Sequence, residues 1–168
     1  AAVQNGANAV YLGCGPFNAR QSAKNFTPQT LKDAVKYCHV RGVDVHLTLN
    51  TLVSDKEIDA LTELIRHAAT CNVDAFIVQD LGVVQLCRQI APHIPVHGST
   101  QMTIHSLSGV QLCAAMGIKR VVLSRELNRE EIRYICANSP IEIEVFVHGA
   151  LCMSYSGQCY MSAAIGGR

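Results

Sequence analysis

The sequence predicts an α/β fold: a parallel (β/α)8 TIM-like barrel that is incomplete in this chain, with about six strands present and the first and last missing. Short apolar runs alternate with helical patterns, which is typical of a parallel sheet whose strands are joined by helices. Nearly every run also ends in a polar or small residue. In a barrel these ends all meet at one mouth, where barrel enzymes place their chemistry. In the alternative, a doubly wound open sheet, they would meet only at a switch point.

Six runs have the strand pattern, and most are apolar stretches without strict alternation, as expected for strands that are covered on both faces. The predicted strands are Ala9–Gly13, Val43–Asn50, Ala75–Asp80, Val96–Met102, Arg120–Ser124 and Ile141–His148. Helical segments with 3.6-residue periodicity lie between them. The clearest apolar stripe consists of Ile58, Leu61, Leu64, Ile65 and Ala68.

Capping patterns predict where the helices begin and end. One helix start is a threonine cap followed by proline, and two are polar caps with a carboxylate three residues later. These starts are Thr27 with Pro28, Ser54 with Glu57, and Asn128 with Glu131. Gly42 and Gly117 each fall between a helical pattern and the next strand, where a glycine commonly ends a helix.

The composition predicts one packed domain. The chain has 168 residues, of which 49% are hydrophobic and 16% charged, and its net charge of +1 gives no electrostatic argument for nucleic acid or a membrane surface. No long apolar stretch or signal-peptide pattern appears, so we expect a cytoplasmic protein with no membrane partner. The chain begins without Met and ends on "IGGR", so we expect residues 1–168 to be a partial barrel domain cut from a longer protein.

The chain has eight cysteines, a high number for its length, and most of them are expected to pack in the core. A helical position predicts that a reduced cysteine packs as a small hydrophobic residue in the core, and this applies to Cys38, Cys71, Cys87, Cys113 and Cys136. Cys14 lies in a Gly-Cys-Gly-Pro turn at the predicted mouth. It is either a turn residue or a ligand or reactive thiol.

Two further cysteines, Cys152 and Cys159, lie in "HGALCMSYSGQC", directly after the last predicted strand and therefore also at the mouth. A soft metal site needs about four thiolates or imidazoles, so these two supply half of one. Their spacing is not that of a zinc ribbon, and a disulfide is disfavoured in the cytosol. From spacing alone, core, nucleophile and metal ligand all stay open.

The common catalytic motifs are absent. There is no HExxH helix, no G-x-S-x-G turn, no P-loop and no GxGxxG. The strand-pattern histidines His46, His97 and His148 are expected to be satisfied by hydrogen bonds. The run Ser99-Thr100-Gln101 has groups suited to orienting a substrate, or it caps the following helix.

The stretch "EVFVHGALCMSYSGQCYMS" resembles the signature of the collagenase-like peptidase family U32. Ten specified positions fit: Glu144, Phe146, Gly149, Ala150, Leu151, Cys152, Gly157, Cys159, Met161 and Ser162. Other stretches resemble family blocks in the family's order: "NGANAVYLG", "TLNTL", "DAFIVQDLGV", "HGSTQMTIHS" and "VVLSREL". The resemblance therefore covers the whole chain.

The resemblance implies a (β/α)8-like barrel followed by further domains. Members were first classed as peptidases, and so as hydrolases, with collagen degradation as the named activity. Better-understood relatives are needed for oxygen-independent hydroxylation of RNA bases or of the quinone ring. They hold a four-iron four-sulfur cluster on four cysteines, of which the first two match Cys152 and Cys159. The other two lie beyond this chain, so the chain alone is expected to be inactive and to hold no cluster.

The stretches "YLGCGPFNAR" and "TLNTLVSDKEI" look most like the branch that hydroxylates a cytidine of ribosomal RNA. We therefore expect an iron–sulfur-dependent, oxygen-independent hydroxylase that acts on a base of rRNA or tRNA, with RNA as its partner. The family blocks favour Gln101, Arg125 and His148 as catalytic residues. The substrate would be lined by the other polar groups at strand ends: Asn50, Gln79, Asp80, Ser99, Thr100 and Glu126.

Two other interpretations stay open. In a collagenase-like peptidase acting on peptides, Cys152 or Cys159 would be the nucleophile and His148 its nearest base. In a non-enzymatic scaffold, the cysteines would hold a cluster for another protein.

Overall fold

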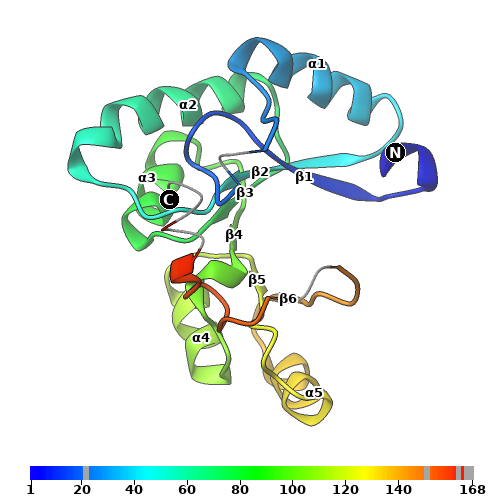
Figure 1. The fold of residues 1–168 in the computed structure, drawn as a ribbon, viewed down its shortest axis with the longest axis vertical. Helices are drawn as coiled ribbons and strands as arrows, with labels where there is room; N and C mark the ends of the chain where they lie inside the picture. The colour runs from blue at the N-terminus through cyan, green and yellow to red at the C-terminus, as the bar shows by residue number, and fades with distance from the viewer. Residues whose placement is uncertain (21–22, 150–151, 162–163, 165–168) are drawn as a thin grey trace.

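The computed structural model describes residues 1–20, 23–149, 152–161 and 164. Its strands form one parallel sheet whose spatial order is the sequence order, β1-β2-β3-β4-β5-β6. They are β1 (Ala9–Gly13), β2 (Asp44–Leu49), β3 (Ala75–Val78), β4 (Val96–Gly98), β5 (Arg120–Val122) and β6 (Glu142–Glu144). A doubly wound sheet reverses its order at a switch point, and this one does not. The sheet curls from β1 to β6 as part of a TIM-like barrel, which confirms the predicted fold class (Figure 1).

Five α-helices alternate with the strands among the described residues. They are α1 (Pro28–His39), α2 (Ile58–Thr70), α3 (Leu81–Ile90), α4 (Leu107–Ala115) and α5 (Arg129–Asn138), with short 3-10 helices η1 (Val3–Asn5), η2 (Asp55–Glu57) and η3 (Thr100–Met102). The three predicted starts are confirmed as capping boxes at Thr27, Ser54 and Asn128. Gly42 and Gly117 have φ of 66° and 83°, the left-handed conformation that favours glycine after a helix.

The predicted strands ran too far at their carboxyl ends. The segment Val96–Met102 is a strand only to Gly98, because the Ser99 hydroxyl accepts a hydrogen bond from the Gln101 amide and starts η3. The segment Ile141–His148 is a strand only from Glu142 to Glu144. At the end of β4 the Ser99 side chain thus bonds to nearby backbone and ends the ladder early. His148 therefore lies four residues beyond β6, in an exposed loop.

The two faces of the sheet differ in chemistry because side chains alternate along each strand. On the outer face, Leu47, Leu49, Phe76 and Val78 pack against the helices and are at most 1% exposed. The predicted stripe on α2 meets them, with Leu61 and Ile65 fully buried. On the inner, concave face several alternate positions are polar, among them His46, Thr48, His97 and Ser99, beside apolar residues such as Ile77.

The five cysteines predicted to pack in the core differ in burial. Cys38, Cys71, Cys87 and Cys113 are buried, as predicted, but Cys136 is exposed. The prediction for Cys136 was wrong because α5 buries only Ile135 among the described core residues, and the next residue along a helix points about 100° away. Within the described part of the chain, no helix is long and apolar enough to cross a membrane.

Candidate functional site

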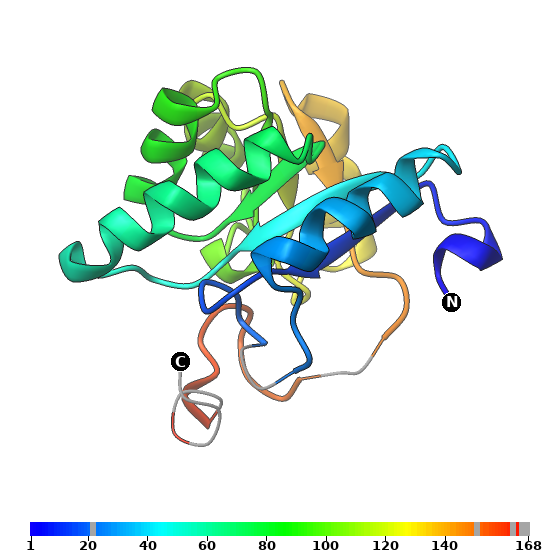
Figure 2. The same cartoon turned by 90° about the horizontal axis from the view of Figure 1, so that it is seen from above.

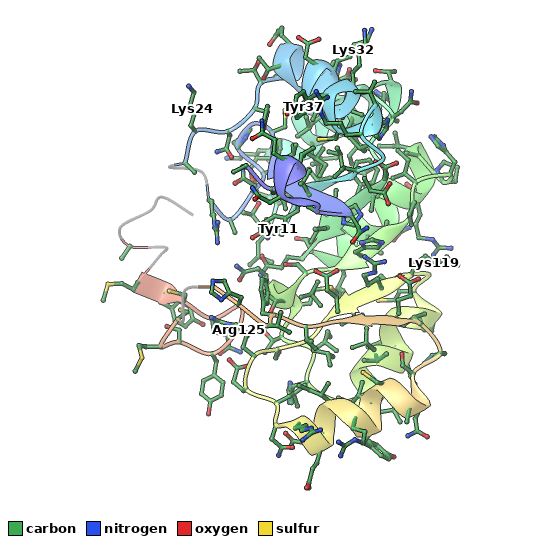
Figure 3. All side chains as sticks on the ribbon, turned by 90° about the vertical axis from the view of Figure 1, so that its right-hand side faces the viewer. Tyr11, Lys24, Lys32, Tyr37, Lys119 and Arg125 are labelled. Atoms are coloured by element: carbon green, nitrogen blue, oxygen red, sulfur yellow. The ribbon has the colours of Figure 1, made fainter. Side chains whose placement is uncertain are left out.

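Polar groups gather at both ends of the inner face, and the two ends differ in how these groups are used. At the carboxyl ends of the strands lie the loops that follow β1, β4, β5 and β6; this end is the mouth. Figure 3 shows Lys24 and Arg125 on the mouth side together with the chain that follows β6, and Lys119 on the opposite side. Figure 2 shows the chain after β1 (blue) and the chain after β6 (orange to red) on the same side of the sheet.

Asn50 links three elements of the mouth. It follows β2, its side-chain oxygen accepts a hydrogen bond from the Ala19 amide at 3.0 Å, and its amide nitrogen lies 3.5 Å from the Ser99 hydroxyl. The loop after β1 is thereby tied to β2 and to the end of β4. Asn50 is thus half-buried at the carboxyl end of β2, and part of its hydrogen-bonding capacity serves the fold; its substrate-lining role stays a prediction.

Three of the predicted substrate-lining groups are engaged with backbone. The Ser99 hydroxyl caps η3, and the Thr100 hydroxyl donates to the carbonyl oxygen of Leu123 at 3.3 Å. Asp80 caps α3 by accepting from the Gly82 amide at 2.7 Å, and its second oxygen accepts from the Val53 amide at 3.3 Å. These side chains hold the loops of the mouth in place.

Residues 152–161, here called the cysteine segment, are attached to the barrel at Ser156. The Ser156 hydroxyl accepts from the amide and the Nε of Arg125 at 3.1 and 3.3 Å. The Glu126 carboxylate accepts from the amide of Ser156 at 2.8 Å and from its hydroxyl at 3.1 Å, and the Thr103 hydroxyl donates to the Ser156 carbonyl at 2.8 Å. Ser156 is 1% exposed, so these bonds are shielded from water. We call this set the Ser156 junction.

Gly157 fits the segment against the loop after β4. Its φ is 78°, and a Cβ at this position would overlap the carbonyl oxygen of Gln101 and lie 2.7 Å from the Thr103 hydroxyl oxygen. Only glycine allows this left-handed turn and this close approach together. The Ser156 junction and Gly157 therefore fix the two cysteines of the segment relative to the barrel.

The two thiols of the segment differ in exposure: Cys152 is exposed and Cys159 is half-buried. Thiolates suit soft metals and iron–sulfur clusters, so the donor type fits such a group, but two donors are half of a complete set. Among the described residues, no group of three or more His, Cys, Asp or Glu side chains could hold a metal ion. The described part of this segment therefore contains two potential thiol donors.

Cys14 does not add a third thiol at the mouth. It is fully buried in the core on the outer face, and burial and the nearby Cys71 raise its pKa. A raised thiol pKa disfavours the thiolate, which is the form that ligates metals and attacks electrophiles. The structure therefore favours the turn-residue interpretation of Cys14.

The remaining predicted residues are spread around the mouth. Gln101 and Gln79 are half-buried, and their side-chain amides have no hydrogen-bond partner among the described residues. Arg125 and Glu126 are exposed but are committed to the Ser156 junction. His148 is exposed and makes no hydrogen bond within the described chain, so no imidazole–thiol pair forms there.

The amino ends of the strands line a cavity of about 630 Å³, and several of its charged groups form ion pairs. Arg120 forms ion pairs with Glu142 at 2.6 Å and Glu144 at 3.5 Å. Asp74 accepts from the Val45 amide at 2.7 Å and lies 2.8 Å from His39. Because barrel enzymes work at the other end, we assign this cavity no chemistry.

Two buried histidines are among the residues that line this cavity. The rings of His46 and His97 meet edge to face, with centroids 5.0 Å apart. Burial, the neighbouring His46 and Arg120 lower the pKa of His97 to about 4, and burial also lowers that of His46. The expectation that the strand histidines are satisfied is wrong for His97, whose Nδ1 is buried without a partner among the described residues.

A sequence profile of peptidase family U32 matches residues 1–168. The chain belongs to this family. The Escherichia coli protein named 23S rRNA 5-hydroxycytidine C2501 synthase is 40% identical over 99% of this chain and 25% of its own length. A Helicobacter pylori protein named tRNA hydroxylation protein P is 40% identical over 99% of this chain and 40% of its own length. The Porphyromonas gingivalis protein named Collagenase is 35% identical over 96% of this chain and 41% of its own length.

The fold is shared with a solved member of the family. The structure of the U32 peptidase Mk0906 matches with a TM-score of 0.67 at 16% identity, over 82% of this chain and 60% of that chain. This likeness concerns the fold alone. The chain spans between a quarter and two fifths of the length of the curated relatives described above.

Sequence reasoning found the cysteines but missed the group that holds them. Ser156 and Thr103 were not predicted, although Ser156 makes five hydrogen bonds with described residues. Its partners lie 30 to 53 positions away in the sequence, so no local pattern indicates them. The one local signal for Ser156 was its position directly before Gly157 and between the two cysteines of the signature.

Proposed function

We propose that the full-length protein is an enzyme that hydroxylates a base of ribosomal or transfer RNA without molecular oxygen. This chain would contribute the mouth of the barrel in which the base reacts. Two relatives named for rRNA and tRNA hydroxylation are each 40% identical to it over nearly its whole length. The observation that carries the proposal is the attachment of the cysteine segment to that mouth through Ser156. Because rRNA and tRNA are cytoplasmic substrates, the proposal also places the full-length protein in the cytoplasm.

In this proposal Cys152 and Cys159 are two of the four ligands of a four-iron four-sulfur cluster. When bound, the cluster would supply redox or Lewis-acid chemistry next to the substrate. The chain's own residues do the rest: the Ser156 junction orients both thiols, and burial of its bonds keeps water from competing for them. The other two ligands would come from residues beyond those described here.

The mouth would orient the base through side chains that the fold leaves unoccupied. The amides of Gln101 and Gln79 can each donate and accept hydrogen bonds, as the edge of a nucleobase requires. His148 is exposed and close to the cysteine segment in the sequence, and its imidazole can form hydrogen bonds with the substrate. Arg125 and Glu126 act mainly by positioning the segment.

A peptidase is the second candidate, because one relative is named Collagenase. A cysteine peptidase needs a thiolate paired with a base. The one thiol–imidazole contact between described residues joins Cys71 and His67 at 3.4 Å, but Cys71 is buried and its burial raises its pKa. No thiol–imidazole contact between described residues lies at the mouth, so the described geometry gives the peptidase less support. A scaffold that only holds a cluster would bind iron but leave RNA unmodified.

The test is mass spectrometry of RNA nucleosides from a deletion strain that carries the full-length gene. We expect hydroxylated nucleosides with the wild-type gene, and their loss with Cys152→Ala or Cys159→Ala. Cys136→Ala is the matched control, since Cys136 is an exposed thiol on α5 away from the mouth. If wild type and deletion strain have the same nucleosides while the purified protein cleaves peptides, the peptidase replaces the hydroxylase.

A further inference from the structure

Exposed apolar side chains are concentrated on and just before the cysteine segment. The described part of the chain has fourteen large exposed hydrophobic residues, and six of them fall between positions 146 and 161. These six are Phe146, Val147, Met153, Tyr155, Tyr160 and Met161. Scattered single residues of this kind are normal on a protein surface, but a concentration of them marks a binding surface.

Two of the six are tyrosines that flank the attachment of the segment. Tyr155 is 70% exposed although the next residue, Ser156, is 1% exposed. Tyr160 is 79% exposed and directly follows Cys159. The backbone around them is held by bonds from the Gln158 amide to the Tyr155 carbonyl and from the Tyr160 amide to the Gln158 carbonyl. Both rings thus project from a fixed backbone; Tyr160 directly follows Cys159, and Tyr155 lies between the two cysteines in the sequence.

Three exposed cations lie at the same end of the barrel as this surface. Arg20 and Lys24 are exposed in the loop after β1, which lies at the same mouth, and Arg125 lies in the loop after β5. Lys24 and Arg125 are on the side of the cysteine segment in Figure 3. Aromatic rings next to cations are the combination with which proteins bind single-stranded nucleic acids, through base stacking and phosphate pairing.

We propose that Tyr155 and Tyr160 are stacking platforms for unpaired nucleotides of the RNA substrate, and that they deliver the target base from a single-stranded segment to the mouth. This inference rests on the proposed function. A base inside a duplex is stacked and paired and cannot reach a thiol-lined mouth, so the substrate segment must be unpaired or the base must leave its stack. The half-buried amides of Gln79 and Gln101 would then bond to the edge of the delivered base.

The experiment uses the full-length protein, purified without oxygen, and a short unstructured RNA oligonucleotide alongside the same sequence annealed as a duplex. Tyr155→Leu and Tyr160→Leu keep an apolar side chain but remove the ring. Tyr155→Phe and Tyr160→Phe keep the ring. Tyr134→Leu is the matched control, because Tyr134 is 60% exposed on α5, away from the cysteine segment.

We expect each leucine variant to weaken binding of the single strand by about tenfold, with the phenylalanine variants and Tyr134→Leu close to wild type. The duplex should bind more weakly than the single strand, and thermal midpoints should not change. Leucine variants that bind the single strand as wild type does would overturn the inference. So would a large fall in thermal midpoint, which would mean that the tyrosines pack against another part of the protein.

Failure of this inference is distinguishable from failure of the proposed function. If the leucine variants bind normally while the wild-type gene still restores hydroxylated nucleosides, the stacking role of the tyrosines is rejected and the proposed function stands. If the wild-type gene restores no hydroxylated nucleoside, the proposed function itself fails, whatever the tyrosine variants bind.

Discussion

The two ends of the barrel's inner face are both polar, but their polar groups make different kinds of bonds. At the mouth, side chains bond to the backbone and side chains of other loops, as in the five hydrogen bonds of Ser156. At the amino end the main contacts are ion pairs between charged side chains, as Arg120 forms with Glu142 and Glu144, although Asp74 also accepts from the Val45 amide. The first arrangement fixes a loop in space, and the second only neutralises charge on strands that the sheet already holds. A site that positions a substrate needs loops that are fixed in this way, as the loops of the mouth are.

The largest loss of activity is expected from Gly157→Ala, which disrupts the contact between the cysteine segment and the loop after β4. An added Cβ would overlap the Gln101 carbonyl in a left-handed turn, so the cysteine segment must move. We expect hydroxylation by the full-length protein to fall by at least about tenfold with the overall fold kept, as judged by nucleoside mass spectrometry and circular dichroism. Gly6→Ala is the control, because Gly6 has φ of 82° with nothing within 4 Å of the added atom. Equal effects of both substitutions would contradict this account.

The amino end should dominate the response of stability to acid. The pKa of His97 is about 4 in the folded protein and 6.5 in the unfolded chain, so the unfolded state binds this proton first as the pH falls. Stability is therefore complete above pH 6.5 and declines towards pH 4, by roughly 3 kcal/mol from this residue. Chemical denaturation of the full-length protein at several pH values measures the decline. His97→Gln should flatten the profile in this window, and an unchanged slope would reject the assignment.

A smaller effect is expected from Ser156→Ala, which weakens the mouth without a clash. The substitution removes the hydroxyl that joins Arg125 to Glu126, but leaves the Ser156 amide on the Glu126 carboxylate. We expect about 1–3 kcal/mol of local destabilisation, seen as faster hydrogen exchange in the cysteine segment with little change elsewhere. Ser108→Ala, an exposed position on α4, should change neither. Exchange that rises evenly over the whole protein would argue against a local junction.

The smallest effect is expected from Glu142→Gln at the amino end. Glu142 is exposed, and ion pairs at exposed positions contribute little because water and salt screen them. Arg120 also keeps Glu144 as a partner. The thermal midpoint and the hydroxylation yield should both stay at wild-type values. A loss of hydroxylation here, with stability unchanged, would give the amino-end cavity a role that we do not assign to it.

The same contrast explains how far the sequence could predict the molecule. Alternating apolar runs and helix caps such as Thr27 and Asn128 depend on neighbours within four residues, and these predictions were confirmed. The predicted ends of β4 and β6 were wrong. For β4 the reason is that apolar periodicity does not reveal that Ser99 bonds to backbone two residues later. The Ser156 junction depends on residues brought together only by folding. The roles of Gln101, Arg125 and His148 stay predictions.

The central claim is that Cys152 and Cys159 act together as ligands at the mouth. The most direct measurement is the iron and sulfide content and visible spectrum of the full-length protein purified without oxygen, with Cys152→Ala, Cys159→Ala and Cys136→Ala in parallel. We predict a brown protein with about four irons, bleached by the first two substitutions and unaffected by the third. A folded but colourless wild-type protein, or one that keeps its iron when either segment cysteine is removed, would contradict the claim.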